Sequence, residues 1–263
     1  MSNIHKTAVI EEGAVIGNNV TIGPFVSISS QSIIGDDTII DAHTIIAGKT
    51  TIGKGNHIFS HAVVGSIPQD LKFNGEDVEL VIGDNNKIRE FTLINPGTEG
   101  GGSITKIGNN NLLMGYVHLG HDVIMGDNCI LANAATLAGH VILGNNVVVG
   151  GLTPVHQFVK IGDFAMIAGA SALSQDIPPF CMAEGNRATL RGLNLTGLRR
   201  HIERDEINLL KVAYKDLFES GEALQESAEK ILNSTSSHNV KKLVKFIMES
   251  KRGIPFKRKN NNG

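Results

Sequence analysis

The sequence predicts a mainly β protein: a parallel β-helix of hexapeptide repeats followed by a C-terminal α-helical domain. Three observations lead to this prediction. An aliphatic residue recurs every six positions over most of the chain. Glycine accounts for 30 of the 263 residues, aromatic residues make up only 5% and Trp is absent, so many tight turns and an aliphatic core are expected. After about residue 185 the period of six gives way to that of an amphipathic helix.

The six-residue repeat runs in two phases, separated by short insertions. A period of six fits neither an α-helix nor a long two-sided strand, but it fits short strands that each end at a corner. Three hexads then form one triangular coil of about 18 residues, and successive coils stack in parallel at about 4.8 Å. The repeated aliphatic positions are Ile4, Ile10, Ile16, Ile22, Ile28, Ile34, Ile40, Ile46, Ile52, Ile58, Val64, Ile82, Ile88 and Ile94, then Ile107, Leu113, Leu119, Met125, Leu131, Leu137, Leu143, Val149, Val155, Ile161, Ile167 and Leu173.

A second position of the repeat, four residues after each aliphatic one, is small or β-branched, as in Ala62, Val117 and Ala135. Because it lies two residues before the next aliphatic residue, strand alternation points both side chains into the coil. Asn and Asp fall where corners are expected, and both tolerate a left-handed backbone. These corner residues are Asn18, Asn19, Asp36, Asn85, Asn110, Asn145 and Asn146.

Two segments interrupt the repeat, at about residues 70–81 and about residues 97–106. Since a coil must otherwise keep its phase, both are expected to be extruded loops, and loops on a rigid scaffold commonly carry function. The β-helix with its two loops is predicted to span residues 1–184.

Residues 185–263 are predicted to form the helical domain. Asp205 is expected to cap a first helix that ends at Gly221, and further helices are predicted near 222–233 and 238–251. The terminal KRKNNNG is predicted to be disordered. The side chains expected to pack the helices together and onto the β-helix are Ile207, Leu210, Tyr214, Leu217, Phe218, Val240, Leu243, Val244 and Ile247.

A triangular column exposes three flat faces along its length. Packing of identical columns through these faces predicts a closed ring, and we expect a homotrimer. A cleft between neighbouring columns can then hold an elongated ligand, with residues contributed by two chains.

The net charge of −2 conceals an asymmetry. Residues 1–184 hold 8 Lys and Arg against 17 Asp and Glu, whereas residues 185–263 hold 16 against 9. The basic part is expected to attract phosphate groups or an acidic protein, unless its charges belong to solvated helix faces. Binding of nucleic acid is not predicted, because few aromatic residues are available there for stacking.

The only cysteines, Cys129 and Cys181, are too few for a disulfide framework or a cysteine metal cluster. The first residues lack the pattern of a signal peptide, and no stretch approaches the roughly 20 apolar residues of a membrane span. The sequence therefore predicts a cytoplasmic protein with no membrane span.

Several of the ten histidines fall in one stretch of coils. His121 lies one coil before the Gly139–His140 pair, and His118 and His156 belong to the same stretch. Imidazoles beside a main-chain N–H can form an acid–base and oxyanion-binding site. The alternative is a row of histidines on a solvated or inter-subunit face.

The histidines allow two further interpretations. His43 and His61, also one coil apart, are interpreted as a row without a functional role. Zinc between subunits, as in the hexapeptide-repeat carbonic anhydrases, is disfavoured because the His spacing in HLGH differs and such enzymes lack a long basic helical tail. No metal is predicted.

Five strings carry a resemblance that covers nearly the whole chain: PQDLKF (68–73), VHLGHD (117–122), ILANAATLAGHV (130–141), GGLTPVHQF (150–158) and EGNRATLRGLNLTGLRR (184–200). Together they resemble the UDP-N-acetylglucosamine acyltransferases that begin lipid A synthesis in Gram-negative bacteria. The resemblance also implies that the coils are left-handed, against the general preference for right-handed crossovers.

The resemblance implies transfer of an (R)-3-hydroxyacyl chain from acyl carrier protein to the 3-position of UDP-N-acetylglucosamine, with no cofactor. It places the catalytic group at His121, Asp122 and Gly139: a general base, a group that orients it, and a main-chain N–H for the oxyanion. Because adjacent strand residues point to opposite faces, pairing of His121 with Asp122 requires a corner or a neighbouring chain.

The resemblance also implies the substrate contacts. A guanidinium suits a diphosphate, and a basic C-terminal part suits the acidic carrier protein. For Lys72 and Arg200 the alternative is a solvated surface charge. The implied contacts are Asp70, Lys72, His118, His140 and Gln157 around the sugar, His156, Asn194 and Arg200 at the nucleotide, and Gly169 in the acyl groove.

Three departures from the family pattern limit what can be carried over. Arg187 replaces the His of EGNHA, so acyl length is not predicted, and Thr196 and His201 leave the uridine contacts open. Three alternative functions also remain: N-acylation of a 3-amino analogue of the sugar nucleotide, another hexapeptide acyltransferase that uses coenzyme A, and a non-catalytic scaffold.

Overall fold

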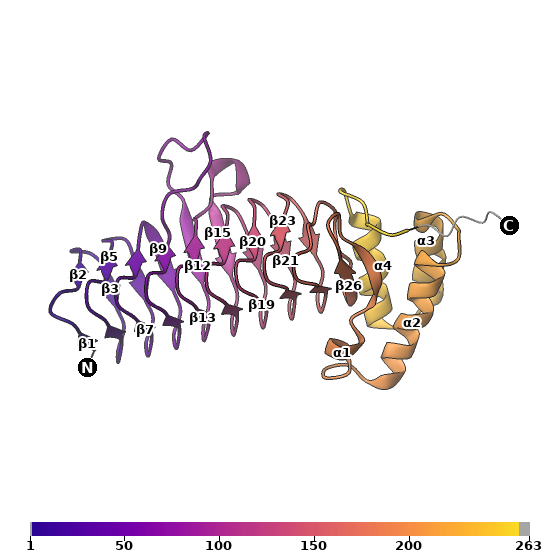
Figure 1. Cartoon of the computed structure of the whole chain (residues 1–263), viewed down its shortest axis with the longest axis horizontal. Helices are drawn as coiled ribbons and strands as arrows, with labels where there is room; N and C mark the ends of the chain where they lie inside the picture. The colour runs from indigo at the N-terminus through magenta and orange to yellow at the C-terminus, as the bar shows by residue number, and fades with distance from the viewer. Residues whose placement is uncertain (1, 258–263) are drawn as a thin grey trace.

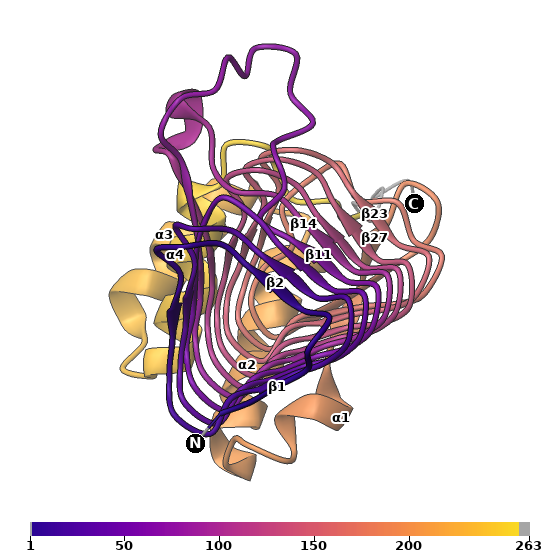
Figure 2. The same ribbon diagram turned by 90° about the vertical axis from the view of Figure 1, so that its left-hand side faces the viewer.

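The computed structural model describes residues 2–257 and consists of a long three-sided column of parallel strands with helices at one end (Figure 1). Viewed from the N-terminal end, the chain runs anticlockwise as it recedes, so the coils are left-handed (Figure 2). The predicted left-handed parallel β-helix with C-terminal helices is therefore confirmed. The predicted disordered end, KRKNNNG, lies outside the described residues except for Lys257.

Each face of the column is one sheet, and each strand pairs with the strand one coil later, as Asn3 pairs with Thr21. Sheet A contains β1 (Asn3–Ile4), β4 (Thr21–Ile22), β7 (Ile39–Ile40), β10 (His57–Ile58), β13 (Lys87–Ile88), β16 (Leu112–Leu113), β19 (Ile130–Leu131), β22 (Val148–Val149), β25 (Met166–Ile167), β26 (Cys181–Glu184) and β27 (Thr189–Leu193). Sheet B contains β2 (Val9–Ile10), β5 (Ser27–Ile28), β8 (Ile45–Ile46), β11 (Val63–Val64), β14 (Leu93–Ile94), β17 (His118–Leu119), β20 (Thr136–Leu137) and β23 (Pro154–Val155). Sheet C contains β3 (Val15–Ile16), β6 (Ile33–Ile34), β9 (Lys49–Ile52), β12 (Glu79–Ile82), β15 (Ile104–Ile107), β18 (Ile124–Met125), β21 (Ile142–Leu143) and β24 (Lys160–Ile161).

The core of the column is built from the two inward positions of the repeat. Ile88 is fully buried, and so are the small residues Ala62 and Ala135 that precede the next aliphatic position by two. Full burial of an aliphatic side chain as large as that of Ile88 stabilises the fold by about 1.5–3 kcal/mol. In the first coil Ile4 remains 46% exposed, because a coil stacks on only one side of it.

The corner residues divide into two sets. Asn19, Asn85, Asn110 and Asn146 have the expected left-handed backbone, whereas Asn18, Asp36 and Asn145 do not. In the second set, Asp36 and Asn145 instead accept from main-chain N–H groups of the preceding coil: Asp36 Oδ1 accepts from the Asn18 N–H at 2.6 Å, and Asn145 Oδ1 accepts from the Asp127 N–H at 2.8 Å. A row of polar side chains at the edge between sheets C and A thus joins successive coils.

Both insertions leave the column at the edge between sheets B and C (Figure 2). The first follows β11 and the second follows β14. His57 pairs with Lys87 at a separation of 30 residues instead of 18, and Lys87 pairs with Leu112 at 25, so the insertions add 12 and 7 residues. The ends of both predicted loops, 79–81 and 104–106, belong to β12 and β15, because Leu80 and Thr105 take buried strand positions there.

The region predicted to be helical begins with a strand. β27 pairs antiparallel with β26, so sheet A continues to Leu193. Then follow α1 (Leu195–Leu198), α2 (Arg204–Phe218), α3 (Leu224–Ser234) and α4 (His238–Glu249). The predicted cap at Asp205 is wrong by two residues, because Glu203 is the N-cap and Asp205 lies in the first turn; likewise α2 ends at Phe218, before Gly221.

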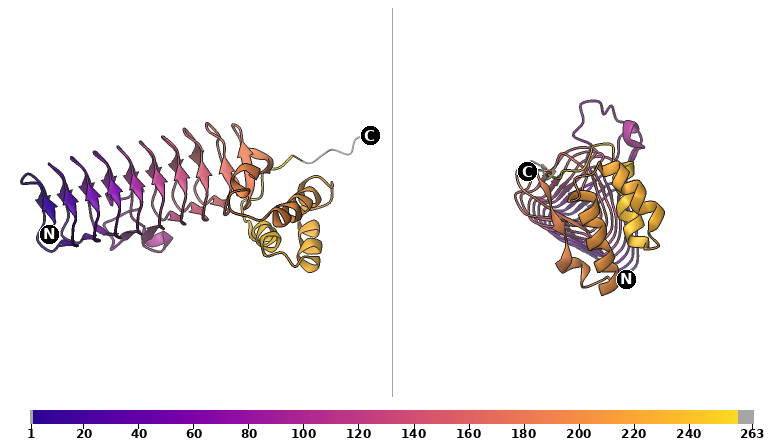
Figure 3. Two further views of the ribbon diagram at one scale, coloured as in Figure 1. Left: turned by 90° about the horizontal axis from the view of Figure 1, so that it is seen from below. Right: turned by 90° about the vertical axis from the view of Figure 1, so that its right-hand side faces the viewer.

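The helices close the C-terminal end of the column (Figure 3). Their buried side chains include Leu210, Leu217 and Leu243, as expected from the helical pattern. The Ser250 hydroxyl donates to Asp176 at 2.7 Å and Lys242 pairs with Asp163, which fixes α4 and the segment after it to the last coils. Among the described residues, every helix is too short or too polar to cross a bilayer.

Candidate active site

The histidines singled out from the sequence gather at the edge between sheets B and C, where both insertions also leave the column. His121, Gly139 and Gln157 follow one another there at intervals of one coil. The His140 N–H donates to the His121 carbonyl at 2.9 Å, which fixes the spacing of the two coils. The fold therefore places His121 directly against Gly139, as coil arithmetic predicts.

The imidazole of His121 occupies the space that a side chain at 139 would need. A Cβ atom on Gly139 would lie 2.5 Å from His121 Cε1 and 2.6 Å from Nε2. Within residues 2–257, no acceptor takes the Gly139 N–H. An imidazole nitrogen and an unpaired main-chain donor are thus adjacent, which is the arrangement that base-assisted acyl transfer requires.

Asp122 lies at the corner itself, with a left-handed φ of 61°. The corner turns its carboxylate back toward its neighbour, and His121 Nδ1 donates to Asp122 Oδ2 at 2.7 Å. Of the two arrangements that allow this pairing, a corner or a neighbouring chain, the structure shows the corner within one chain.

The Asp122 carboxylate is almost fully buried and has a further partner that sequence reasoning missed. The Thr98 N–H donates to Oδ1 at 2.8 Å, and the Thr98 hydroxyl donates to Oδ2 at 2.6 Å. Thr98 belongs to the second loop, which the repeat pattern identifies as an insertion. No feature of its sequence indicates which strand residue it would reach, because that depends on how the loop folds back.

Two more histidines, His118 and His140, flank the His121–Asp122 pair. Burial lowers the pKa of His118, whose Nδ1 donates to the Leu93 carbonyl at 3.2 Å, and the nearby His121 lowers it further. Burial also lowers the pKa of His140, with opposing effects from Asp122 and His121, and Asp70 acts on it through space to raise it. Both flanking rings are therefore neutral at neutral pH, and the first loop brings Asp70 into electrostatic range.

His121, Asp122 and His140 form a set of possible metal ligands, with one atom of each within 4.8 Å of the others. Two imidazoles and a carboxylate suit zinc. Here, however, the carboxylate already accepts three hydrogen bonds, two from Thr98 and one from His121. A cation bound at Oδ2 and at His121 Nδ1 would have to break the bond between these two atoms, so the arrangement favours acid–base chemistry.

Three other predicted contacts are exposed near the same edge. Lys72 lies in the first loop, where its N–H donates to Asp70 Oδ1 at 3.0 Å. Gln157 follows Gly139 by one coil. His156 lies beside a pocket of about 380 Å³ that Arg187 also lines, and its Nδ1 lies 3.1 Å from the Gln157 carbonyl and 3.3 Å from the Arg252 guanidinium.

The remaining predicted residues lie on other parts of the column. Gly169 is at the edge between sheets A and B. Asn194 caps α1: its side chain accepts from the Gly197 N–H at 3.1 Å and donates to the Phe164 carbonyl at 2.9 Å. One chain therefore does not bring Gly169 and Asn194 to the edge that carries His121.

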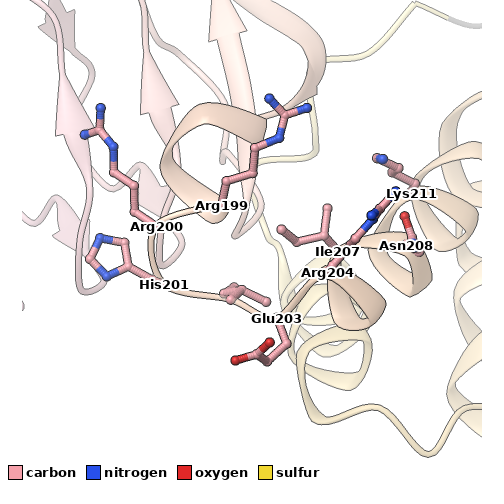
Figure 4. Close-up of a pocket in the computed structure, with 9 residues that line it drawn as sticks. Arg199, Arg200, His201, Glu203, Arg204, Ile207, Asn208 and Lys211 are labelled. Carbon is pink, nitrogen blue, oxygen red and sulfur yellow. The ribbon is translucent and has the colours of Figure 1, made fainter.

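Arg200 lines a pocket of about 610 Å³ between the turn after α1 and the start of α2 (Figure 4). Cationic side chains dominate this pocket, and Glu203 is its one carboxylate. The other cationic or potentially cationic residues that line it are Arg199, His201, Arg204 and Lys211. The pocket suits an anionic ligand such as a phosphate group.

The row formed by His43 and His61 lies at the edge between sheets A and B. The two rings stack at 5.0 Å and continue into Phe25 on one side and Phe91 on the other. This stacking agrees with the interpretation of the row as a structural ladder.

Comparison with known proteins gives a consistent result. A family model described as "Udp N-acetylglucosamine O-acyltransferase; Domain 2" matches residues 176–255, and one described as "Bacterial transferase hexapeptide (six repeats)" matches residues 104–139. The chain is 70% identical over 260 residues to an acyl-[acyl-carrier-protein]--UDP-N-acetylglucosamine O-acyltransferase of a Sulfurovum species, covering 99% of this chain and 100% of the relative.

Solved structures agree with the sequence comparison. The UDP-N-acetylglucosamine acyltransferase from Campylobacter jejuni superposes with a TM-score of 0.94 at 52% identity, covering 97% of this chain and 100% of the other. The corresponding enzyme from Francisella novicida superposes with a TM-score of 0.93 at 37% identity, covering 98% and 95%.

Proposed function

Because the chain belongs to the family of UDP-N-acetylglucosamine O-acyltransferases, we propose that it transfers an (R)-3-hydroxyacyl chain from acyl carrier protein to the 3-hydroxyl of UDP-N-acetylglucosamine. This is the first step of lipid A biosynthesis. The observation that carries the proposal is the juxtaposition of the His121 imidazole and the unpaired Gly139 N–H.

The proposed mechanism begins at His121 Nε2. Because Nδ1 donates to Asp122, Nε2 carries the lone pair and takes the proton of the sugar hydroxyl as its oxygen attacks the thioester carbonyl. The Gly139 N–H receives the developing oxyanion, a contribution of about 10² to 10³ in rate. The tetrahedral intermediate then expels the carrier-protein thiolate, which takes the proton back from the imidazolium.

The flanking histidines are proposed to bind the sugar as neutral hydrogen-bonding groups. Burial lowers the pKa of both His118 and His140, so neither ring adds positive charge that would oppose protonation of His121. Asp70, Lys72 and Gln157 remain proposed sugar contacts, and Gly169 a proposed part of the acyl groove.

The cationic pocket around Arg200 is proposed to hold the nucleotide diphosphate, and the basic helical domain to attract the acidic acyl carrier protein. His156 and Asn194 remain proposed nucleotide contacts, although the Asn194 side chain already makes one hydrogen bond that caps α1 and one to the Phe164 carbonyl of the column. The cytoplasmic location predicted from the sequence stays a prediction.

A homotrimer is proposed on the same grounds. Residues expected around one substrate lie at different edges of the column, so a single chain does not complete the site. A ring of three columns would let the His121 edge of one chain face the Arg200 pocket or the Gly169 edge of a neighbour.

Purified protein incubated with UDP-N-acetylglucosamine and a series of 3-hydroxyacyl carrier proteins tests the activity, with products identified by mass. We expect one ester product, strongly reduced in His121→Ala. Product only with the 3-amino analogue would change the acceptor to an amine, and product only with acyl-coenzyme A would change the donor. No product with any pair would refute the enzyme assignment, and full activity of His121→Ala would refute the mechanism.

A further inference from the structure

The second loop folds back onto the column and covers one catalytic-site carboxylate. It comprises residues 97–103 and contains one short 3₁₀ turn, Glu99–Gly101. Its N-terminal residue Gly97 and its last residue Ser103 both bond at its base: the Gly97 N–H donates to the Glu79 carbonyl at 3.2 Å, and the Ser103 N–H to the Thr98 carbonyl at 2.8 Å. The first bond ties the loop to β12, and the second closes the loop on itself.

Thr98 is the residue through which this loop contacts Asp122. It is 5% exposed and donates both its N–H and its hydroxyl to the two oxygens of that carboxylate. On the other side the Asp122 N–H donates to the Thr105 hydroxyl at 2.8 Å, just after the loop. Asp122 is thus held on both sides by residues at the two ends of the second insertion.

Glycine at position 101 allows this close approach. A Cβ atom there would overlap the Asp122 carboxylate, whereas Gly100 and Gly102 have open space around them. The three consecutive glycines therefore do not have the same role. Glycine is required at position 101 because a side chain there would collide with Asp122. At position 102 glycine is favoured because the backbone has a left-handed φ of 96°.

From this geometry we infer that Thr98 is a positioning residue for acyl transfer, acting through Asp122 on the orientation and tautomer of His121. Asp122 Oδ2 accepts from both the Thr98 hydroxyl and His121 Nδ1. The two Thr98 donors hold the carboxylate so that a lone pair of Oδ2 faces Nδ1. His121 therefore keeps its proton at Nδ1 and its free lone pair at Nε2, beside Gly139. The role of Thr98 in the reaction rests on the proposed function.

The test compares three variants of the full-length protein in the acyl transfer assay. Thr98→Val removes the hydroxyl and keeps the shape and the main-chain bond, while Thr98→Ser keeps the hydroxyl. Thr44→Val is the matched control, because the Thr44 hydroxyl is also buried but donates to a main-chain carbonyl, that of Phe59, in a coil away from His121. All are first compared by thermal unfolding.

We expect Thr98→Val to lower kcat by about tenfold to a hundredfold, with KM for both substrates changed by less than about twofold. Thr98→Ser should recover most of this loss, and Thr44→Val should match the wild type.

Wild-type kcat in Thr98→Val, alongside an inactive His121→Ala, would overturn the role of Thr98 and leave the proposed function intact. Equal losses in the Val and Ser variants would also overturn it. Should Thr98→Val fail to fold, Gly101→Ala decides, because its Cβ displaces the same carboxylate without touching Thr98: full activity there contradicts the inference. Failure of the proposed function itself would show as no product from the wild type.

Discussion

At the scale of single residues, the site depends on two glycines for different reasons. Gly139 leaves room for the His121 imidazole, and Gly101 leaves room for the Asp122 carboxylate. In both cases the missing side chain permits a contact from another coil. Neither glycine has the positive φ that would require glycine on backbone grounds.

Gly139→Ala tests the first of these contacts. The added Cβ lies 2.5 Å from His121 Cε1, so the ring must rotate away from the position where Nε2 meets the acceptor. We expect kcat to fall by about a hundredfold or more, with little change in stability, because the ring can move outward.

The matched control is Gly115→Ala, where the nearest atom to the added Cβ is the flexible Asn133 side-chain amide at 3.3 Å. Steady-state kinetics and thermal unfolding of both variants check the prediction. Equal activity of Gly139→Ala and the wild type would show that His121 does not work from the observed position.

At the scale of elements, the sequence predicts the column well because each strand position repeats. Inward aliphatic residues, inward small residues and both insertions follow from periodicity alone. What it does not predict depends on single contacts: β27 lies in the segment expected to be helical, since its pairing with β26 has no repeat, and α1 is too short to show a period. The site follows the same division, because the His121–Gly139 contact comes from the 18-residue coil, whereas the Thr98–Asp122 contact comes from the path of a loop.

Ile88→Ala and Ile4→Ala test the contribution of the coils. Both residues take the inward aliphatic position of sheet A, but Ile88 is fully buried between two coils while Ile4 is 46% exposed in the first coil. We expect Ile88→Ala to cost about 2–5 kcal/mol and Ile4→Ala less than about 1 kcal/mol. Denaturant unfolding at one fixed protein concentration measures both, and similar losses for the two would contradict a core built from stacked coils.

At the scale of the whole molecule, the predicted site residues divide among separate regions of one rigid column. His121 and Asp122 lie at the edge between sheets B and C, Gly169 at the edge between A and B, and Arg200 beside α2. Neighbouring coils are joined through continuous sheets, so bending of the column cannot bring these regions together. If all of them contact one substrate, some must come from another chain.

Mixed trimers of His121→Ala and Arg200→Ala subunits test this sharing directly. Each variant alone should be strongly impaired, since every site lacks either the base or the guanidinium. When the two are co-expressed with different tags and purified through both tags, each trimer contains both variants. In a ring where one chain gives His121 and its neighbour gives Arg200, about one third of the sites then carry both native residues. The activity of each mixed trimer should therefore rise to about a third of the activity of a wild-type trimer. Mixed trimers no more active than the separate variants would mean that one chain supplies both residues, and a monomeric mass by sedimentation would remove the premise of sharing.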